Sequence, residues 1–170
     1  MPDQPGLISA DFPVAWDPNA PSPVVLSDGT KTYLVFTVYA GNVDWDARGQ
    51  ELLAGTLEPQ HDYRCIVTIP GRNIRFGGPN EEVRHGHPLA GRGIVADTVQ
   101  VVPDSQWIAE LRSMNTRHAR FNPARWDAMK HFVFWFRDDT FECVAASLEL
   151  EVTSDPLQVV LARLTAGIHG

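Results

Sequence analysis

Residues 24–39 read VVLSDGTKTYLVFTVY, and this stretch decides the type of fold that the chain adopts. The Asp28-Gly29 pair is a strong signal for a two-residue turn between two apolar runs. From Thr32 to Tyr39, β-branched and aromatic residues occupy both alternating faces, which is typical of a central strand. The stretch therefore predicts an antiparallel hairpin whose second strand lies inside a sheet.

Further strand and helix signals extend this hairpin into a fold class. Strand-like runs are predicted over residues 63–69, 73–76, 94–102, 131–136 and 141–152. Helices are predicted after Asp104, after the Asn122-Pro123 pair and after the Asp155-Pro156 pair. Hairpins and irregular loops join the strands, so we expect an α+β fold with a mainly antiparallel sheet or partly closed β-barrel. It would have about seven strands, two short helices in the second half and a C-terminal amphipathic helix.

The length of 170 residues favours one domain, preceded by a proline-rich arm. Six of the thirteen prolines fall within residues 1–23, where Phe12, Val14 and Trp16 alternate and predict an edge strand against the body. We therefore expect an arm over residues 1–23 and a single α+β domain over residues 24–170.

Charge and composition exclude several classes of function. The net charge of −7 and the pI near 5.2 argue against nucleic-acid binding, which needs a clustered basic face. The chain has no apolar run that predicts a membrane span and no signal-peptide pattern near Met1. Cys65 and Cys143 lie in apolar runs, where free cysteine behaves as a small hydrophobic residue. A cytoplasmic protein is the simplest expectation.

The loop over residues 76–93 is the strongest candidate for a functional segment. It contains five glycines and two prolines, together with two carboxylates, two arginines and two histidines. Such a composition excludes a regular α-helix or a central strand, and polar irregular loops often carry binding groups. His85 and His87 project to the same side if the segment is extended, and could then hold a divalent metal ion. The third ligand in this hypothesis is His118, with Glu81, Glu82, His131 and Glu142 as alternatives. The sequence leaves any other cofactor unknown.

His131 and Glu142 form a second candidate site, with possible catalytic roles. They lie on facing arms of the hairpin predicted over residues 131–152, where His131 could act as a general base. A pocket is expected between the glycine-rich loop, the strand around Trp135 and the helix of Trp107. The candidate ligand-binding residues are Asn80, Glu82, Arg84, His87, Trp107, Asn115, His131 and Trp135.

Three functions remain open from the sequence. The first is a protein that binds a small molecule or peptide, or a basic partner protein, without strong chemistry of its own. The second is a metal-dependent enzyme with His85 and His87 as ligands. The third is a structural or assembly subunit, such as a homo-oligomer, that pairs through an edge strand.

Overall fold

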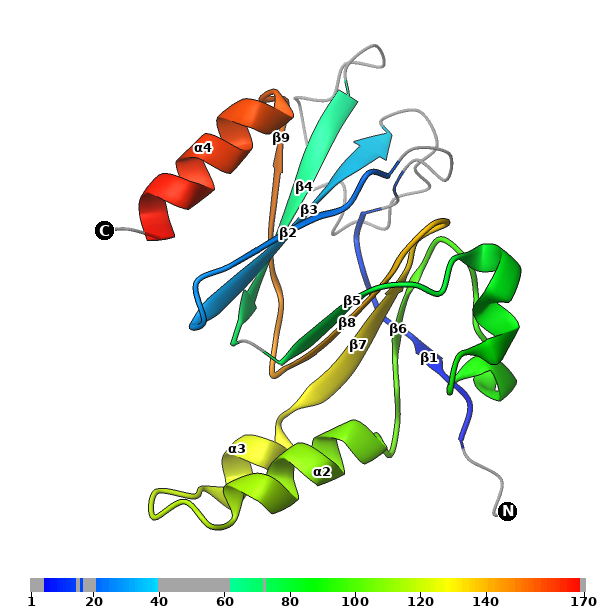
Figure 1. Ribbon diagram of the computed structural model, residues 1–170, viewed down its shortest axis with the longest axis vertical. Helices are drawn as coiled ribbons and strands as arrows, with labels where there is room; N and C mark the ends of the chain where they lie inside the picture. The colour runs from blue at the N-terminus through cyan, green and yellow to red at the C-terminus, as the bar shows by residue number, and fades with distance from the viewer. Residues whose placement is uncertain (1–4, 15, 17–20, 40–61, 72, 169–170) are drawn as a thin grey trace. The chain divides into compact units, whose positions relative to one another are not determined.

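The computed structural model describes residues 5–14, 16, 21–39, 62–71 and 73–168 (Figure 1). The polar, glycine-punctuated sequence over residues 41–60 predicts a long connection, and this segment lies outside the described ranges. The chain forms two compact units: one comprises Met1–Asp11 and Asn73–Leu148, and the other comprises Phe12–Arg72 and Glu149–Gly170. Each unit is therefore assembled from segments that are distant in the sequence. The single domain over residues 24–170 stays a prediction.

The first unit contains a five-stranded antiparallel sheet in the order β1-β6-β7-β8-β5. Its strands are β1 (Ile8–Ser9), β5 (Ile74–Gly77), β6 (Val99–Val101), β7 (Lys130–Trp135) and β8 (Thr140–Ala145). β7 and β8 form the predicted hairpin and are central, which explains why nearly all of their side chains are buried. One face of β7 carries Phe132 and Phe134, and the other carries His131, Val133 and Trp135.

The second unit contains a four-stranded antiparallel sheet in the order β2-β3-β4-β9. Its strands are β2 (Val24–Ser27), β3 (Lys31–Tyr39), β4 (Asp62–Pro70) and β9 (Glu149–Thr153). The predicted hairpin is confirmed, with residues 28–30 between its strands: Gly29 has a φ of +84°, and the Asp28 carboxylate accepts the backbone N–H of Lys31 at 2.7 Å. The predicted central position of β3, between β2 and β4, is confirmed as well.

Helix α4 (Leu157–Ile168) is the predicted C-terminal amphipathic helix, and it packs on the second sheet. Its fully buried Val160 contacts Val35 on β3 and Ile66 on β4. Leu157 and Leu164 add half-buried contacts on the same stripe of the helix. Burial of this stripe explains why the segment is helical and ordered against the sheet.

The first unit carries the two short helices, α2 (Gln106–Asn115) and α3 (Pro123–Asp127). Asn122 caps α3 as expected. The cap of α2 is Ser105 rather than Asp104, because the Ser105 Oγ accepts the Ile108 N–H at 3.2 Å. Asp104 instead has a φ of +50°, in the left-handed region that aspartate tolerates better than most residues.

The α+β class and the mainly antiparallel pairing are confirmed, and the strands are divided between two sheets. Nine strands of the described residues form two sheets, and neither sheet closes into a barrel. The run over residues 141–152 divides, because its first half pairs with β7 and its second half pairs with β4 in the other sheet. Within the described residues of the arm, Ile8–Ser9 pairs with β6, and Trp16 is buried and bridges to Val38.

The glycine-rich loop contains two short 3₁₀ helices, η1 (Glu81–Gly86) and η2 (Ala90–Arg92). The strand predicted over residues 94–102 is correspondingly short, since only β6 pairs with a neighbour. The composition of the loop correctly excluded an α-helix. The backbone groups of the loop are hydrogen-bonded in the two 3₁₀ helices instead.

Candidate functional site

One face of the β7–β8–β5 part of the sheet forms the floor of the candidate site. Glu142 on β8 pairs with Val133 on β7 and with Arg75 on β5. His131 lies two positions before Val133, so it projects from the same face as Glu142. The strand register therefore brings His131, Glu142 and Arg75 side by side from three separate strands.

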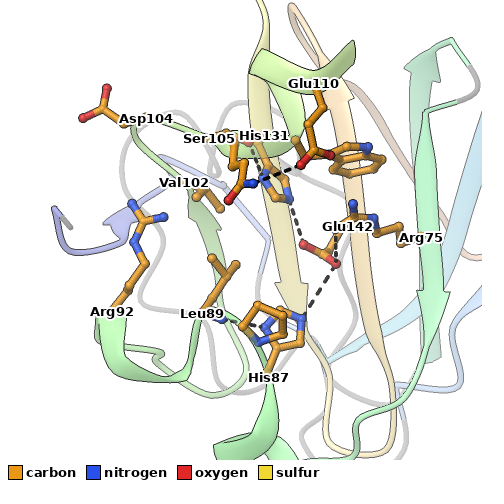
Figure 2. Close-up of a pocket in the computed structure, with 13 residues that line it drawn as sticks. Arg75, His87, Leu89, Arg92, Val102, Asp104, Ser105, Glu110, His131 and Glu142 are labelled. Carbon is orange, nitrogen blue, oxygen red and sulfur yellow. Dashed lines mark hydrogen bonds and ion pairs between the residues drawn. The ribbon is translucent and has the colours of Figure 1, made fainter. Parts of the chain in front are cut away.

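The Glu142 carboxylate is the centre of the site, between two histidines (Figure 2). His131 Nε2 lies 2.9 Å from Oε2, while His87 Nε2 and Arg75 Nη1 each lie 3.7 Å from Oε1. Burial by itself raises the pKa of Glu142, but hydrogen bonding to the two histidines outweighs it and lowers the pKa from 4.5 to about 2. Glu142 is therefore an ionised acceptor at neutral pH, although it is only 6% exposed.

The glycine-rich loop positions His87 beneath this carboxylate. His87 follows η1 in an extended conformation, and its backbone N–H donates to the Arg84 carbonyl at 2.9 Å. The Leu89 N–H donates to His87 Nδ1 at 3.2 Å, so the neutral ring carries its proton on Nε2, the atom that faces Glu142. The ring meets the buried Trp135 edge-on at a centroid distance of 5.1 Å.

Ser105 extends the chain of polar contacts on the other side of His131. Its Oγ lies 2.9 Å from His131 Nδ1, and it also accepts the Ile108 N–H that begins α2. Because Glu142 is ionised, His131 Nε2 is the donor to it, and Nδ1 of the neutral ring accepts the Ser105 hydroxyl proton. The result is a continuous Ser105–His131–Glu142 chain of hydrogen bonds.

Trp107 and Arg75 form the wall above the carboxylate. The Arg75 guanidinium lies 4.0 Å from the centroid of the Trp107 ring, a cation–π arrangement. The Trp107 ring also meets His131 edge-on at 5.1 Å. Arg75 has a half-exposed side chain, so its remaining N–H donors face solvent or a ligand rather than a buried partner.

These groups surround a cavity of about 240 Å³ within the first unit. Arg92 lies on its opposite side, with Asp104 beyond it, away from the His131–Glu142 contact (Figure 2). The Arg92 guanidinium is held by backbone, since it donates from Nε to the Pro5 carbonyl at 2.8 Å and from Nη2 to the Pro103 carbonyl at 2.6 Å. It fastens the N-terminal segment and the start of α2 to this wall.

Four of the candidate residues, His87, Trp107, His131 and Glu142, are brought together around the cavity. The other candidates do not line it. Asn80 caps η1, Glu82 is exposed, Arg84 donates to the Phe136 carbonyl, Asn115 donates to the Leu111 carbonyl and Trp135 is fully buried. The aromatic wall of the cavity is therefore Trp107, whereas Trp135 belongs to the core beneath His87.

The three histidines of the metal hypothesis are not brought together. His85 is exposed and lines a separate shallow pocket, and the exposed His118 accepts the Arg120 N–H at 3.1 Å. Within the described ranges, no group of three or more histidine, cysteine, aspartate or glutamate side chains is arranged to hold a metal ion. The segment is not extended throughout, because His85 lies within the 3₁₀ helix η1 and only His87, which follows η1, has an extended backbone.

Sequence reasoning missed Arg75, Ser105 and Arg92 as residues of this site. Arg75 joins it only through the pairing of β5 with β8, which the sequence does not reveal. Ser105 carried a usable signal, because serine before a helical apolar stripe is a preferred N-cap. Asp104 is an equally good cap by type, and only the geometry of the turn separates the two residues.

Comparisons with protein-family models, with curated proteins and with solved structures found no match to this chain. Among the described residues, no helix is both long enough and apolar enough to cross a membrane. The function must therefore be argued from the chemistry of the cavity.

Proposed function

We propose that this protein binds a small polar molecule in the cavity formed by His87, Trp107, His131 and Glu142. The observation that carries the proposal is the ionised, almost completely buried Glu142 carboxylate at the edge of an open cavity. A buried charge is costly unless it is well paired, and strongly perturbed groups that line a cleft are enriched at functional sites.

The lining groups indicate the chemistry of the ligand. Glu142 accepts hydrogen bonds, and the half-exposed Arg75 donates them within 3.7 Å of the same carboxylate. A ligand with a donor group for Glu142 and an anionic or carbonyl oxygen for Arg75 would satisfy both residues. Trp107 supplies apolar surface for the rest of the molecule. The cavity volume of about 240 Å³ favours a small molecule over a peptide or a protein partner.

Ligand-observed NMR with a library of small amino acids, hydroxy acids and amides tests this proposal. Compounds that bind the wild-type protein should bind Glu142→Gln about tenfold or more weakly, because a hydrogen bond to a charged group is lost. His87→Ala should weaken binding as well. His118→Ala is the matched control, since that histidine is exposed and outside the cavity. Binding that is equal in all four proteins would contradict the proposal.

A cytoplasmic location is part of the same proposal. Cys65 and Cys143 are both buried free thiols, and burial raises the pKa of each well above its ordinary value. Such thiols are inert hydrophobic groups that a reducing compartment keeps unpaired. Fractionation of the native organism's cells with an antibody to the protein tests this location.

A further inference from the structure

We infer that Ser105 is the nucleophile of an ester-hydrolysing site, with His131 as its general base and Glu142 as the group that orients His131. The inference rests on the proposed function, because the ester would occupy the same cavity. The substrate class is a small carboxylic ester, whose carbonyl carbon reaches Ser105 and whose polar substituents meet Arg75 and Glu142.

The first support is the geometry of the three side chains. The Ser105 Oγ to His131 Nδ1 distance and the His131 Nε2 to Glu142 Oε2 distance are both 2.9 Å. These are the two hydrogen bonds that define a serine–histidine–carboxylate triad, and such triads are recognised by geometry rather than by position in the sequence. Here Nδ1 faces the serine and Nε2 faces the carboxylate, and either imidazole nitrogen can accept a proton.

The second support is that the same three residues line a cavity rather than close-packed core. Ser105, His131 and Glu142 are respectively 8%, 3% and 6% exposed, and all three border the cavity of about 240 Å³. The site is therefore shielded from bulk water while it remains open to a small substrate. If Ser105 only capped α2 and His131 only paired with Glu142, these residues would not need to border a cavity.

The third support is the start of α2, which supplies donors for a developing oxyanion. The Ile108 and Ala109 N–H groups are engaged by the side chain and the carbonyl of Ser105. Within the described part of the chain, no hydrogen bond occupies the backbone N–H groups of Gln106 and Trp107. They immediately follow the nucleophile, at the positive end of the helix dipole, where negative charge is stabilised.

The reaction follows from these positions in two steps. Ser105 Oγ forms a bond to the ester carbonyl carbon while its proton moves to His131 Nδ1, and Glu142 stabilises the resulting imidazolium. The bond from the carbonyl carbon to the alcohol oxygen then breaks, and the alcohol leaves with the proton from Nδ1. Water next attacks the acyl carbon and gives a proton to Nδ1. The carboxylic acid leaves, and the Ser105 oxygen recovers its hydrogen from His131.

Labelling with a fluorophosphonate, followed by mass spectrometry, tests the nucleophile without knowledge of the natural ester. We expect one adduct per chain, on the peptide that contains Ser105. Ser105→Asn should abolish the adduct while it retains a side chain that can cap α2. Glu142→Gln should slow labelling by about a hundredfold or more, because the histidine loses its orienting carboxylate. The matched control Ser113→Ala removes an exposed serine of the same helix and should label like the wild type.

The outcomes separate this inference from the proposed function. Labelling at Ser105, together with release of p-nitrophenol from p-nitrophenyl acetate that Ser105→Asn lacks, supports the inference. A folded wild-type protein that forms no adduct, or an adduct at another serine, overturns it. If ligand binding still depends on Glu142 in that case, the proposed function stands alone. If neither labelling nor Glu142-dependent binding is found, both are wrong.

Discussion

At the scale of single residues, Glu142 shows how burial and hydrogen bonding compete. Desolvation disfavours its charged form, yet the interactions with His131 and His87 keep the carboxylate ionised. The sequence identified His131 and Glu142 as a candidate pair, because they face each other across a predicted hairpin. It did not identify His87 as a partner of the same carboxylate, since that contact depends on how η1 turns.

The lowered pKa of Glu142 makes the stability of the protein depend on acid pH. The pKa in the folded protein, about 2, lies below the ordinary 4.5, so the unfolded chain binds this proton more tightly. The stabilising contribution is therefore complete above pH 4.5 and is lost as the pH falls towards 2. Glu142→Gln should lower the unfolding free energy at pH 6 by up to about 3 kcal/mol.

Urea unfolding between pH 7 and pH 2.5, followed by circular dichroism, measures this effect. The difference in unfolding free energy between wild type and Glu142→Gln should shrink as the pH falls through that range. Asp127→Asn is a control, because Asp127 makes only an exposed ion pair with Arg112. A difference that stays constant with pH would mean that Glu142 titrates normally in the folded protein.

At the scale of elements, the stability of α4 against the second sheet depends on one buried stripe of side chains rather than on its polar surface. Val160 is fully buried against Val35 and Ile66, whereas its neighbour Val159 is 47% exposed. Val160→Ala should lower the unfolding free energy by about 2 kcal/mol, because it removes buried methyl groups and leaves a cavity. Val159→Ala should change it by less than about 0.5 kcal/mol. Urea denaturation of the two variants checks this, and equal effects would contradict the packing of α4 described above.

The helices were predicted better than the limits of the strands. The starts of α3 and α4 were predicted from Asn122-Pro123 and Asp155-Pro156, because capping and first-turn signals are local. The run over residues 141–152 gave no local sign that it divides between two sheets. The local sequence of a strand does not specify its partner strand. The division is therefore set by long-range pairing with β7 and with β4.

At the scale of the whole molecule, both compact units join segments that are distant in the sequence. The first unit uses the N-terminal segment as β1, where Ile8 pairs with Val101 and Leu7 donates to the Arg92 carbonyl at 2.7 Å. Arg92 in turn donates to the Pro5 carbonyl beside the cavity. The N-terminal arm therefore contributes to the wall of the candidate site.

Removal of residues 1–10 should consequently loosen the first unit. Hydrogen–deuterium exchange should show faster exchange of β6 amide protons, because one edge of β6 loses its partner strand. Amide protons of β3 and β4 should keep their protection, since their pairing lies within the second unit. Unchanged exchange in β6 would show that β1 contributes little to the sheet.

The sequence alone determined the α+β class, the antiparallel hairpins, the helix positions and the place of His131 and Glu142 on facing arms of one hairpin. All of these depend on local turn and capping chemistry or on the alternation of side chains along a strand. Only the tertiary structure decided the two sheets, the place of Arg75 beside Glu142 and the contact of Ser105 with His131. These depend on which strand edges meet and on where α2 begins relative to β7. That choice is set by long-range backbone pairing and burial, which no single segment encodes by itself.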